Sequence, residues 1–264
     1  MKYVTWNVNS LNARLPFVLE WVRVNAPDVL CLQETKLKDD GFPVGPFGEL
    51  GYFCEHLGQG RWNGVAILSK APIENVSKGA VLEEFEHLHE ARHISGTTLG
   101  VRVHSVYVPN GRSRQDPHFI YKLKWLRDLK ELLAVELHEF SDVVVAGDFN
   151  IAPQDEDVWD PIALEGSTHV SAEERGLLSE ITDLGLVDVH RLLNPDKVEF
   201  SWWDYRNGAF HKGEGMRIDL ALFSSGLAKT VKRVYVDRDA RKVSSVGKPS
   251  DHAPLVIESS GIGV

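Results

Sequence analysis

The sequence predicts one α/β domain that spans residues 1–264. Short runs of Val, Ile, Leu and aromatic residues recur from end to end, and turn residues bound each of them. Segments with a helical spacing of apolar residues lie between these runs. Strands and helices that interleave along a whole chain favour one α/β domain over two domains. No long linker or low-complexity tract divides the sequence.

Seven segments are predicted as strands, because each is short, apolar and rich in β-branched or aromatic residues. In chain order they are YVTWNVNS (3–10), DVLCLQET (28–35), GVAILSK (64–70), TLGVRVHSVYVP (98–109), SDVVVAGDFN (141–150), MRIDLALFS (216–224) and HAPLVIES (252–259).

Three segments are predicted as helices. The first covers residues 15–25 and stops before Pro27, because the residue ahead of a proline disfavours helical geometry. The second begins with Asp116 and Pro117, a good cap and first-turn pair, and carries leucines at helical spacing. The third opens with a capping box of Ser171 and Glu174 and ends at Gly185.

Composition points to an ordinary globular protein, with 43% hydrophobic and 25% charged residues. No apolar run approaches the roughly 18 residues of a membrane span, and the first ten residues lack the features of a signal peptide. Cys31 and Cys54 are poor disulfide candidates, so we expect a reducing, cytoplasmic environment. The net charge of −9 leaves the partner open, because the field in one cleft matters more than the sum.

The stretch VVVAGDFNIAP (143–153) reads as a buried strand that ends in polar residues. Gly147 removes bulk just before Asp148, and Pro153 ends strand pairing. Side chains alternate along a strand, so Asp148 and Asn150 are expected on one face. Taken alone, this pattern is more typical of a loop cap than of a functional site.

Five other segments place polar residues where a predicted strand ends or begins, which makes coincidence a weaker explanation. An unpaired carboxylate is costly to bury, and active sites of layered folds lie where strand ends converge. The residues concerned are Asn7 and Asn9, Glu34, Tyr107 and Asn110, Asp219, and Asp251 with His252.

This set suits metal-assisted phosphoryl chemistry. Mg²⁺ takes oxygen ligands and needs only one or two carboxylates, so Glu34 is the best candidate ligand, with Asn9 and Asp251 near it. The roles of the other residues follow from the needs of hydrolysis. Asp148 and Asn150 can activate and aim a water; His252, Asn7 and Asn150 can stabilise negative charge; Asp219 can orient His252. No Ser or Cys lies in a nucleophile-elbow pattern.

The motifs WNVNSL, LQETK, YVPNG, GDFNIAP, FSWWDYR, GMRIDL and PSDHAPL closely resemble the exonuclease III branch of apurinic/apyrimidinic endonucleases. They occur in the family's order from near residue 4 to near residue 256. GDFN with a later SDH marks the wider endonuclease/exonuclease/phosphatase superfamily, whereas LQETK, FSWWDYR and RID point to the DNA-repair branch. The resemblance implies a four-layered α/β sandwich of the DNase I type, in which two packed sheets are flanked by helices.

The resemblance also implies the substrate and further site residues. It implies a monomeric enzyme that acts with Mg²⁺ or Mn²⁺ on double-stranded DNA with abasic sites or damaged 3′ ends, with no membrane partner. Glu34 matches the principal metal ligand of the family and Tyr107 its active-site tyrosine. The family's damage pocket matches Trp202, Met216 and Ile218, and the residues expected to contact phosphate or DNA are Asn7, Arg92, Asn110, Arg112 and Arg217.

Two rival classes share parts of this pattern. Phosphoinositide phosphatases and sphingomyelinases of the same superfamily carry GDFN and SDH, but they need a recognition insertion, and no long extra loop is evident. A non-enzymatic binding domain on this fold is expected to lose Glu34, Asp148 or His252, and all three are present. The sequence therefore predicts a catalytic nuclease and leaves open the balance among abasic incision, 3′-phosphodiesterase and exonuclease activity.

Overall fold

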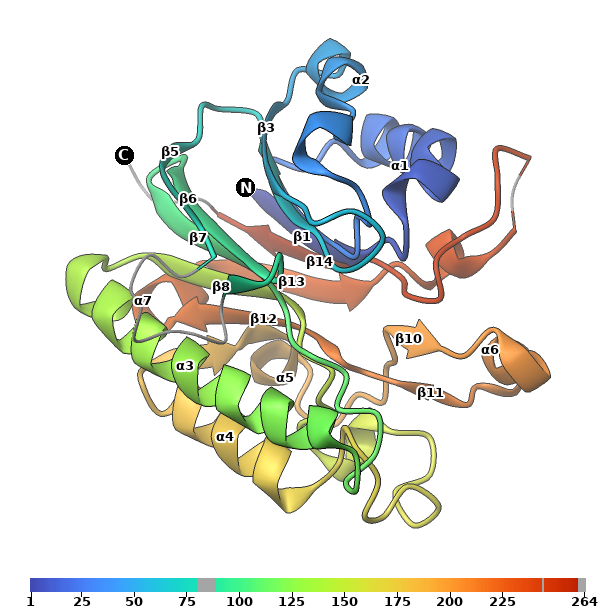
Figure 1. Ribbon diagram of the computed structural model, residues 1–264. Helices are drawn as coiled ribbons and strands as arrows, with labels where there is room; N and C mark the ends of the chain where they lie inside the picture. Colours follow the sequence, from blue (N-terminus) through green and yellow to red (C-terminus); the bar gives the residue numbers. More distant parts are fainter. Residues whose placement is uncertain (80–88, 244, 261–264) are drawn as a thin grey trace.

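Two six-stranded sheets form the centre of the computed structural model, which describes residues 1–79, 89–243 and 245–260 (Figure 1). In spatial order the first sheet contains β13 (Val231–Val236), β14 (Leu255–Ser259), β1 (Lys2–Asn7), β2 (Val29–Gln33), β4 (Val65–Ser69) and β3 (Phe53–Leu57). The second contains β5 (Glu74–Lys78), β6 (His93–Thr98), β7 (Val101–Tyr107), β8 (Val143–Asp148), β12 (Asp219–Ser224) and β9 (Leu186–Asp188).

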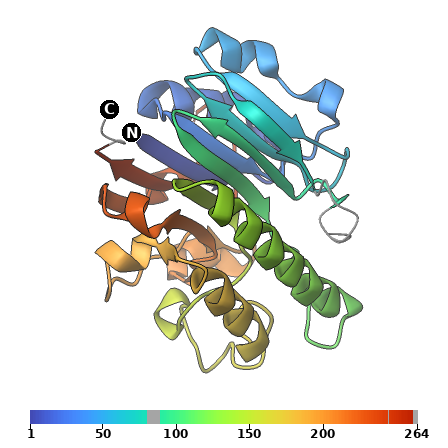
Figure 2. The same ribbon diagram turned by 90° about the vertical axis from the view of Figure 1, so that its left-hand side faces the viewer.

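Helices cover the outer face of each sheet, which gives four layers (Figures 1 and 2). The first sheet is covered by α1 (Leu11–Asn25) and α2 (Val44–Glu49), and the second by α3 (Pro117–Glu139) and α4 (Ala172–Thr182). The shorter elements are α5 (Val189–Leu193), α6 (Ala209–Lys212), α7 (Ser225–Ala228) and the antiparallel pair β10 (Trp202–Trp203) and β11 (Gly215–Met216). The expected four-layered sandwich is confirmed.

Three apolar clusters match the three interfaces between the layers. Strand alternation divides the side chains of β1 between two of them: Tyr3 faces the second sheet, whereas Val4 and Trp6 face α1. The same alternation on β8 sends Val144 toward the first sheet and Val145 toward α3. Burial on both faces explains why these strands read as continuous apolar runs.

Each of the seven predicted strand segments contains a strand, and each predicted helix is present. The helix caps at Asp116 and Ser171 form as predicted. The first helix begins at Leu11, four residues earlier than predicted, and continues through Pro16. The third ends at Thr182 rather than at Gly185. Cys31 and Cys54 are both free, and among the described residues no helix is long and apolar enough to cross a membrane.

Each sheet contains one parallel pair of strands, β1 with β2 and β7 with β8. Because parallel strands end at the same edge, four strand ends meet at one edge of the sandwich. Near this edge, polar side chains take the place of apolar ones between the two sheets. Gln33 donates to Ser105 across the two sheets at 3.1 Å and accepts from Thr5 at 3.2 Å. Polar strand ends therefore converge beside an otherwise apolar interface.

Gly147 allows the close approach of β7 and β8 at this edge. A Cβ atom there would lie 1.9 Å from the carbonyl oxygen of Val106, a backbone atom that cannot turn aside. We expect Gly147→Ala to destabilise the protein by about 1–3 kcal/mol, as overpacking does elsewhere. Gly176→Ala is the matched control, because a Cβ on Gly176 of α4 meets nothing within 4 Å. That change should stabilise by about 0.5–1 kcal/mol. Urea unfolding measures both, and equal stability of the two variants would contradict this explanation.

Candidate active site

Three polar residues of the second sheet lie side by side on neighbouring strands. Asp148 ends β8, and its register partners are Tyr107 at the end of β7 and Asp219 at the start of β12. All three belong to the strand face that packs toward the first sheet, because Ala146 and Ala221, two residues away, belong to the cluster between the sheets. The fold therefore brings together residues from three separate motifs of the sequence.

The side-chain amide of Asn7 joins the two sheets at this edge. Asn7 ends β1 and is fully buried. Its Nδ2 donates to Oε1 of Glu34 and to Oδ2 of Asp148, both at 2.8 Å. Glu34 follows β2 in the first sheet, and Asp148 belongs to the second. One amide therefore satisfies a carboxylate from each sheet and fixes the distance between them.

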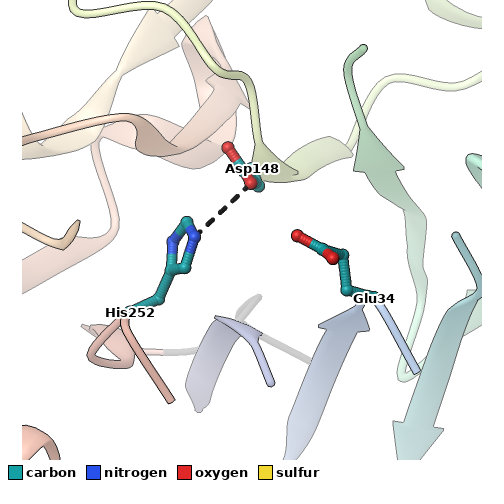
Figure 3. A group of neighbouring side chains, drawn as sticks. All are labelled: Glu34, Asp148 and His252. Atoms are coloured by element: carbon teal, nitrogen blue, oxygen red, sulfur yellow. Dashed lines mark ion pairs between the residues drawn. The ribbon is translucent and has the colours of Figure 1, made fainter. Parts of the chain in front are cut away.

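His252 lies between the carboxylates of Asp219 and Asp148. Figure 3 shows its ion pair with Asp148, with the Glu34 carboxylate nearby. Its Nδ1 is 2.8 Å from Oδ2 of Asp219, and its Nε2 is 3.7 Å from Oδ2 of Asp148. Burial alone lowers the pKa of His252, but the charges of Asp219 and Asp148 outweigh burial and raise this pKa to about 10. The imidazole is therefore positively charged at neutral pH and can donate from both nitrogens.

Burial has the opposite consequence for the acids of the site. It raises the pKa of Asp148 to about 7, with His252 opposing the shift and Asp219 adding to it. Burial and then the charge of Glu34 raise the pKa of Tyr107 well above its usual value. Tyr107 therefore remains a neutral phenol that can donate a hydrogen bond, and Asp148 can exchange a proton near neutral pH.

A cation already lies between two of the predicted metal ligands. The ammonium of Lys36 is 2.9 Å from Oε2 of Glu34 and 2.6 Å from Oδ1 of Asn9. Oδ1 of Asp251 accepts from Asn9 at 2.9 Å. These hard oxygen donors fit Mg²⁺ or Mn²⁺ by type. Within the described part of the chain, ligand atoms of Glu34, Asp148 and His252 also lie within 4.8 Å of one another. The arrangement can hold a metal ion.

The same backbone turn follows β1 and β8. Asn9 donates its backbone N–H to Oδ1 of Asn7, and Asn150 does so to Oδ1 of Asp148, both at 2.9 Å. Asn9 and Asn150 have φ angles of 41° and 50°, a left-handed geometry that Asn tolerates better than most residues. The strands therefore end at Asn7 and Asp148, two residues before Asn9 and Asn150, and the turn rather than strand alternation places these two asparagines beside the site.

A cavity of about 170 Å³ opens beside these groups. The predicted pocket residues Trp202, Met216 and Ile218 line it together with His252. Trp202 is half-buried and donates through Nε1 to Oδ2 of Asp251 at 3.1 Å. Met216 and Ile218 are buried against Val158. The three walls therefore surround one space next to the acidic cluster.

The sequence comparison identifies the family. Residues 4–252 match the model of the endonuclease/exonuclease/phosphatase family. The chain belongs to this family.

Relatives and solved structures from the branch that the motifs resemble match almost the whole chain. Exodeoxyribonuclease III of Haemophilus influenzae is 35% identical over 98% of this chain and 99% of its own. The solved structure of a 3′-5′ exonuclease from Neisseria meningitidis has a TM-score of 0.94 at 40% identity, over 98% of this chain and 99% of the other. An AP endonuclease from Archaeoglobus fulgidus has a TM-score of 0.93 at 36% identity, with the same coverage. The resemblance to the exonuclease III branch is confirmed.

Arg217 was predicted to contact DNA, and the structure corrects this. Its side chain is fully buried, and its Nε and Nη2 bind the carboxylate of Asp157 at 2.6 and 3.0 Å. Nη1 binds Asp188 at 2.8 Å. A guanidinium that is buried in the protein and bound to two carboxylates cannot contact a phosphate of DNA. Its place between Met216 and Ile218 instead anchors the strand segment that forms one wall of the pocket.

The other predicted DNA contacts differ in exposure. Arg112 has a side chain that is 62% exposed, and Asn110 is exposed while it donates to Oδ1 of Asn150 at 3.1 Å. Arg92 is only 8% exposed; it binds Glu90 at 2.5 Å and stacks on the Tyr107 ring, 4.7 Å from its centroid. Arg112 and Asn110 remain available to a ligand, whereas Arg92 is committed mainly to contacts that orient Tyr107.

Three residues that shape the candidate active site were not predicted from the sequence. His169 lines the cavity with a φ of 78° and places Nδ1 2.5 Å from the carbonyl oxygen of Asn150. Ser201 accepts the backbone N–H groups of Ile218 and Asp219, both at 3.1 Å. Lys36 is the cation beside Glu34. Lys36 lies in the motif LQETK and Ser201 in the motif FSWWDYR, so the sequence carried a signal for both, whereas His169 lies in a segment without periodicity.

The Asp219–His252 pair yields a direct test. Asp219→Asn removes the negative charge that contributes most to raising the pKa of His252. We expect this pKa to fall from about 10 toward the ordinary value of about 6.5. An NMR titration of the His252 ring in the metal-free variant measures the fall. Activity should drop more at pH 9 than at pH 7, because the variant loses its imidazolium as the pH rises. The same His252 pKa in parent and variant would contradict the pairing.

Proposed function

We propose that this chain is a metal-dependent DNA-repair nuclease that hydrolyses the phosphodiester bond 5′ to abasic sites. It also removes groups from damaged 3′ ends and acts as a 3′→5′ exonuclease. The observation that supports this most is the convergence of Glu34, Asp148 and the Asp219–His252 pair at one edge of two sheets. Relatives named exodeoxyribonuclease III and AP endonuclease, over nearly their whole length, add the DNA substrate. A Neisseria 3′ phosphatase structure bound to a product DNA hairpin adds the 3′ end.

Glu34 is the proposed principal ligand of Mg²⁺, with Asn9 and Asp251 beside it, and Mn²⁺ can take the place of Mg²⁺. When bound, the ion supplies Lewis-acid stabilisation of charge on the phosphoryl oxygens. The ammonium of Lys36 now contacts the oxygens of Glu34 and Asn9, so a bound ion would take the place of this cation. Burial raises the pKa of Asp251, but His252 and hydrogen bonds from Asn9 and Trp202 outweigh it and keep this carboxylate ionised.

Asp148 is the proposed general base for the attacking water, and Asn150 aims that water. A base is most useful when its pKa lies near the working pH, and burial raises the pKa of Asp148 to about 7. The amide of Asn7 holds Oδ2 of Asp148, and the backbone of Asn150 holds Oδ1, so the carboxylate cannot rotate freely. The orientation is set before substrate enters.

The charged His252 is the proposed partner of the phosphate oxygen that becomes more negative. Asp219 holds Nδ1, so Nε2 is directed at the space next to Asp148. The neutral phenol of Tyr107 supplies another donor beside the same position. Both N–H groups of the Asn7 amide already donate to Glu34 and Asp148, so Asn7 holds these carboxylates in place. Fixed donors in a buried site need no reorganisation as charge develops, and this is a large source of catalysis.

The cavity walled by Trp202, Met216 and Ile218 is the proposed binding place of the abasic sugar. A sugar without its base is small and partly apolar, so a cavity of about 170 Å³ favours it over a whole nucleotide. Arg112 and Asn110, on the exposed side, are the proposed DNA backbone contacts.

We also propose that the protein is a monomer in the cytoplasm, which is consistent with its two free cysteines. The lipid-phosphoesterase alternative is not favoured, because the relatives compared are nucleases.

The function is tested with three substrates and Mg²⁺: a duplex with one abasic site, a recessed 3′ end and a 3′-phosphate end. We expect the parent to act on all three, and EDTA to abolish each activity. Glu34→Gln should lower kcat/KM by more than about 100-fold, because groups that merely orient a metal ligand already contribute about 10–100-fold. Circular dichroism should show an unchanged fold. Full activity in EDTA, or activity on phosphoinositides instead of DNA, would overturn the proposal.

The pocket is tested by shortening its largest wall. Trp202→Ala should slow abasic incision roughly 10–100-fold, because a sugar that is no longer held in place loses its alignment. Trp202→Phe is the matched control: it loses the hydrogen bond to Asp251 but keeps an aromatic wall. It should retain most of the abasic activity. If folded Trp202→Ala incises abasic DNA as fast as the parent, the pocket is assigned wrongly.

A further inference from the structure

A fully buried ion pair lies directly behind the candidate active site. Lys122 of α3 and Glu174 of α4 both have side chains with no exposed surface, and Nζ of Lys122 is 2.5 Å from Oε1 of Glu174. The catalytic roles proposed above use neither residue. Burying two charges is expensive, and an apolar pair of the same size is often as stable or more stable. Helix packing alone therefore does not explain this pair.

The pair contacts the loop that carries Asn150. Nζ of Lys122 donates to the carbonyl oxygen of Asn150 at 2.6 Å, and that oxygen also accepts from Nδ1 of His169. The left-handed turn at Asn150 directs its carbonyl away from the strand ladder and into the protein, where it needs donors. Lys122 thus holds the backbone of Asn150. The side chain of Asn150 in turn donates to the carbonyl oxygen of Val108 and accepts from the side-chain amide of Asn110.

Glu174 fastens the opposite wall of the cavity. Its Oε1 accepts the backbone N–H of His169 at 3.0 Å and also lies 3.0 Å from the hydroxyl of Thr168. The same hydroxyl lies 3.0 Å from the carbonyl oxygen of Asn110, so Thr168 links Glu174 to the Asn110 loop. Its Oε2 accepts the N–H and the hydroxyl of Ser171. One ion pair therefore connects α3 and α4 to the three loops that present Asn110, Asn150 and His169 to the cavity.

We propose that Lys122 and Glu174 are positioning residues, whose buried ion pair holds the Asn150 turn in its reactive geometry. The inference rests on the proposed function, because Asn150 aims the attacking water there. The charged donor is needed at Asn150 because its short, strong hydrogen bond restricts the turn more than a neutral contact does. The pair accordingly affects the rate of the chemical step more than the stability of the fold or the affinity for DNA.

The test replaces both charges together, so that neither partner is left alone in the interior. In Lys122→Met/Glu174→Gln we expect kcat on the best DNA substrate to fall roughly 10–100-fold. The melting temperature should stay equal to or above that of the parent, and the Kd for the same duplex in EDTA should change by less than about two-fold. Lys130→Met/Glu180→Gln is the matched control, because that pair also joins α3 to α4 but is exposed to solvent. Its kcat should equal the parent value.

A double-mutant cycle shows whether the effect passes through Asn150. In an Asn150→Ala background, neutralising the Lys122–Glu174 pair should lower kcat little further. An equal loss in both backgrounds, or no loss in either, would overturn the proposal. NMR of the Asn150 side-chain amide provides a readout without activity, and its signals should shift in the neutral pair. If the parent cuts no DNA, the proposed function fails. Independently of that result, an Asn150 amide signal that is the same in the parent and in the neutral-pair variant would contradict the positioning role.

Discussion

The Asn7 amide is the contact on which the active-site edge depends, because it binds one carboxylate from each sheet. The carboxylates of Glu34 and Asp148 have oxygen atoms within 4.8 Å of each other, so they would repel each other if both were ionised and had no partner. Asn7 donates to both at 2.8 Å, and the cations of Lys36 and His252 balance the charge on either side. The parallel pairs β1–β2 and β7–β8 make this contact possible, since they bring four strand ends to one place.

Around this contact, the loops are held by charged groups inside the protein rather than by packing alone. Arg217 and Asp157 support the wall formed by Met216 and Ile218, and Lys122 with Glu174 supports the turn at Asn150. Buried ion pairs add little net stability, but each fixes a geometry, because leaving either partner alone is costly. The fold thus combines an apolar interior between four layers with ionic supports where side chains must be aimed.

Much of the fold could be predicted from sequence because strands buried on both faces, such as VVVAG of β8, are continuous apolar runs. Strand β5 was missed because ENVSK is largely exposed and polar, and β13 because Lys232 and Arg233 interrupt its apolar pattern. At the site, strand-end motifs revealed the acids and His252. The buried position of Arg217 was not predicted, because a charged residue at the start of a strand looks exposed until its partners Asp157 and Asp188, sixty and twenty-nine residues away in sequence, are seen.

The central claim is that these strand ends form one site for a divalent cation with Glu34 as its main ligand. Anomalous diffraction from a crystal soaked in Mn²⁺ tests this most directly. The structure predicts a strong peak about 2.1 Å from a carboxylate oxygen of Glu34, close to Asn9 and Asp251 and with Lys36 displaced from its present contact. A peak bound elsewhere, with none at Glu34 under saturating Mn²⁺, would contradict it.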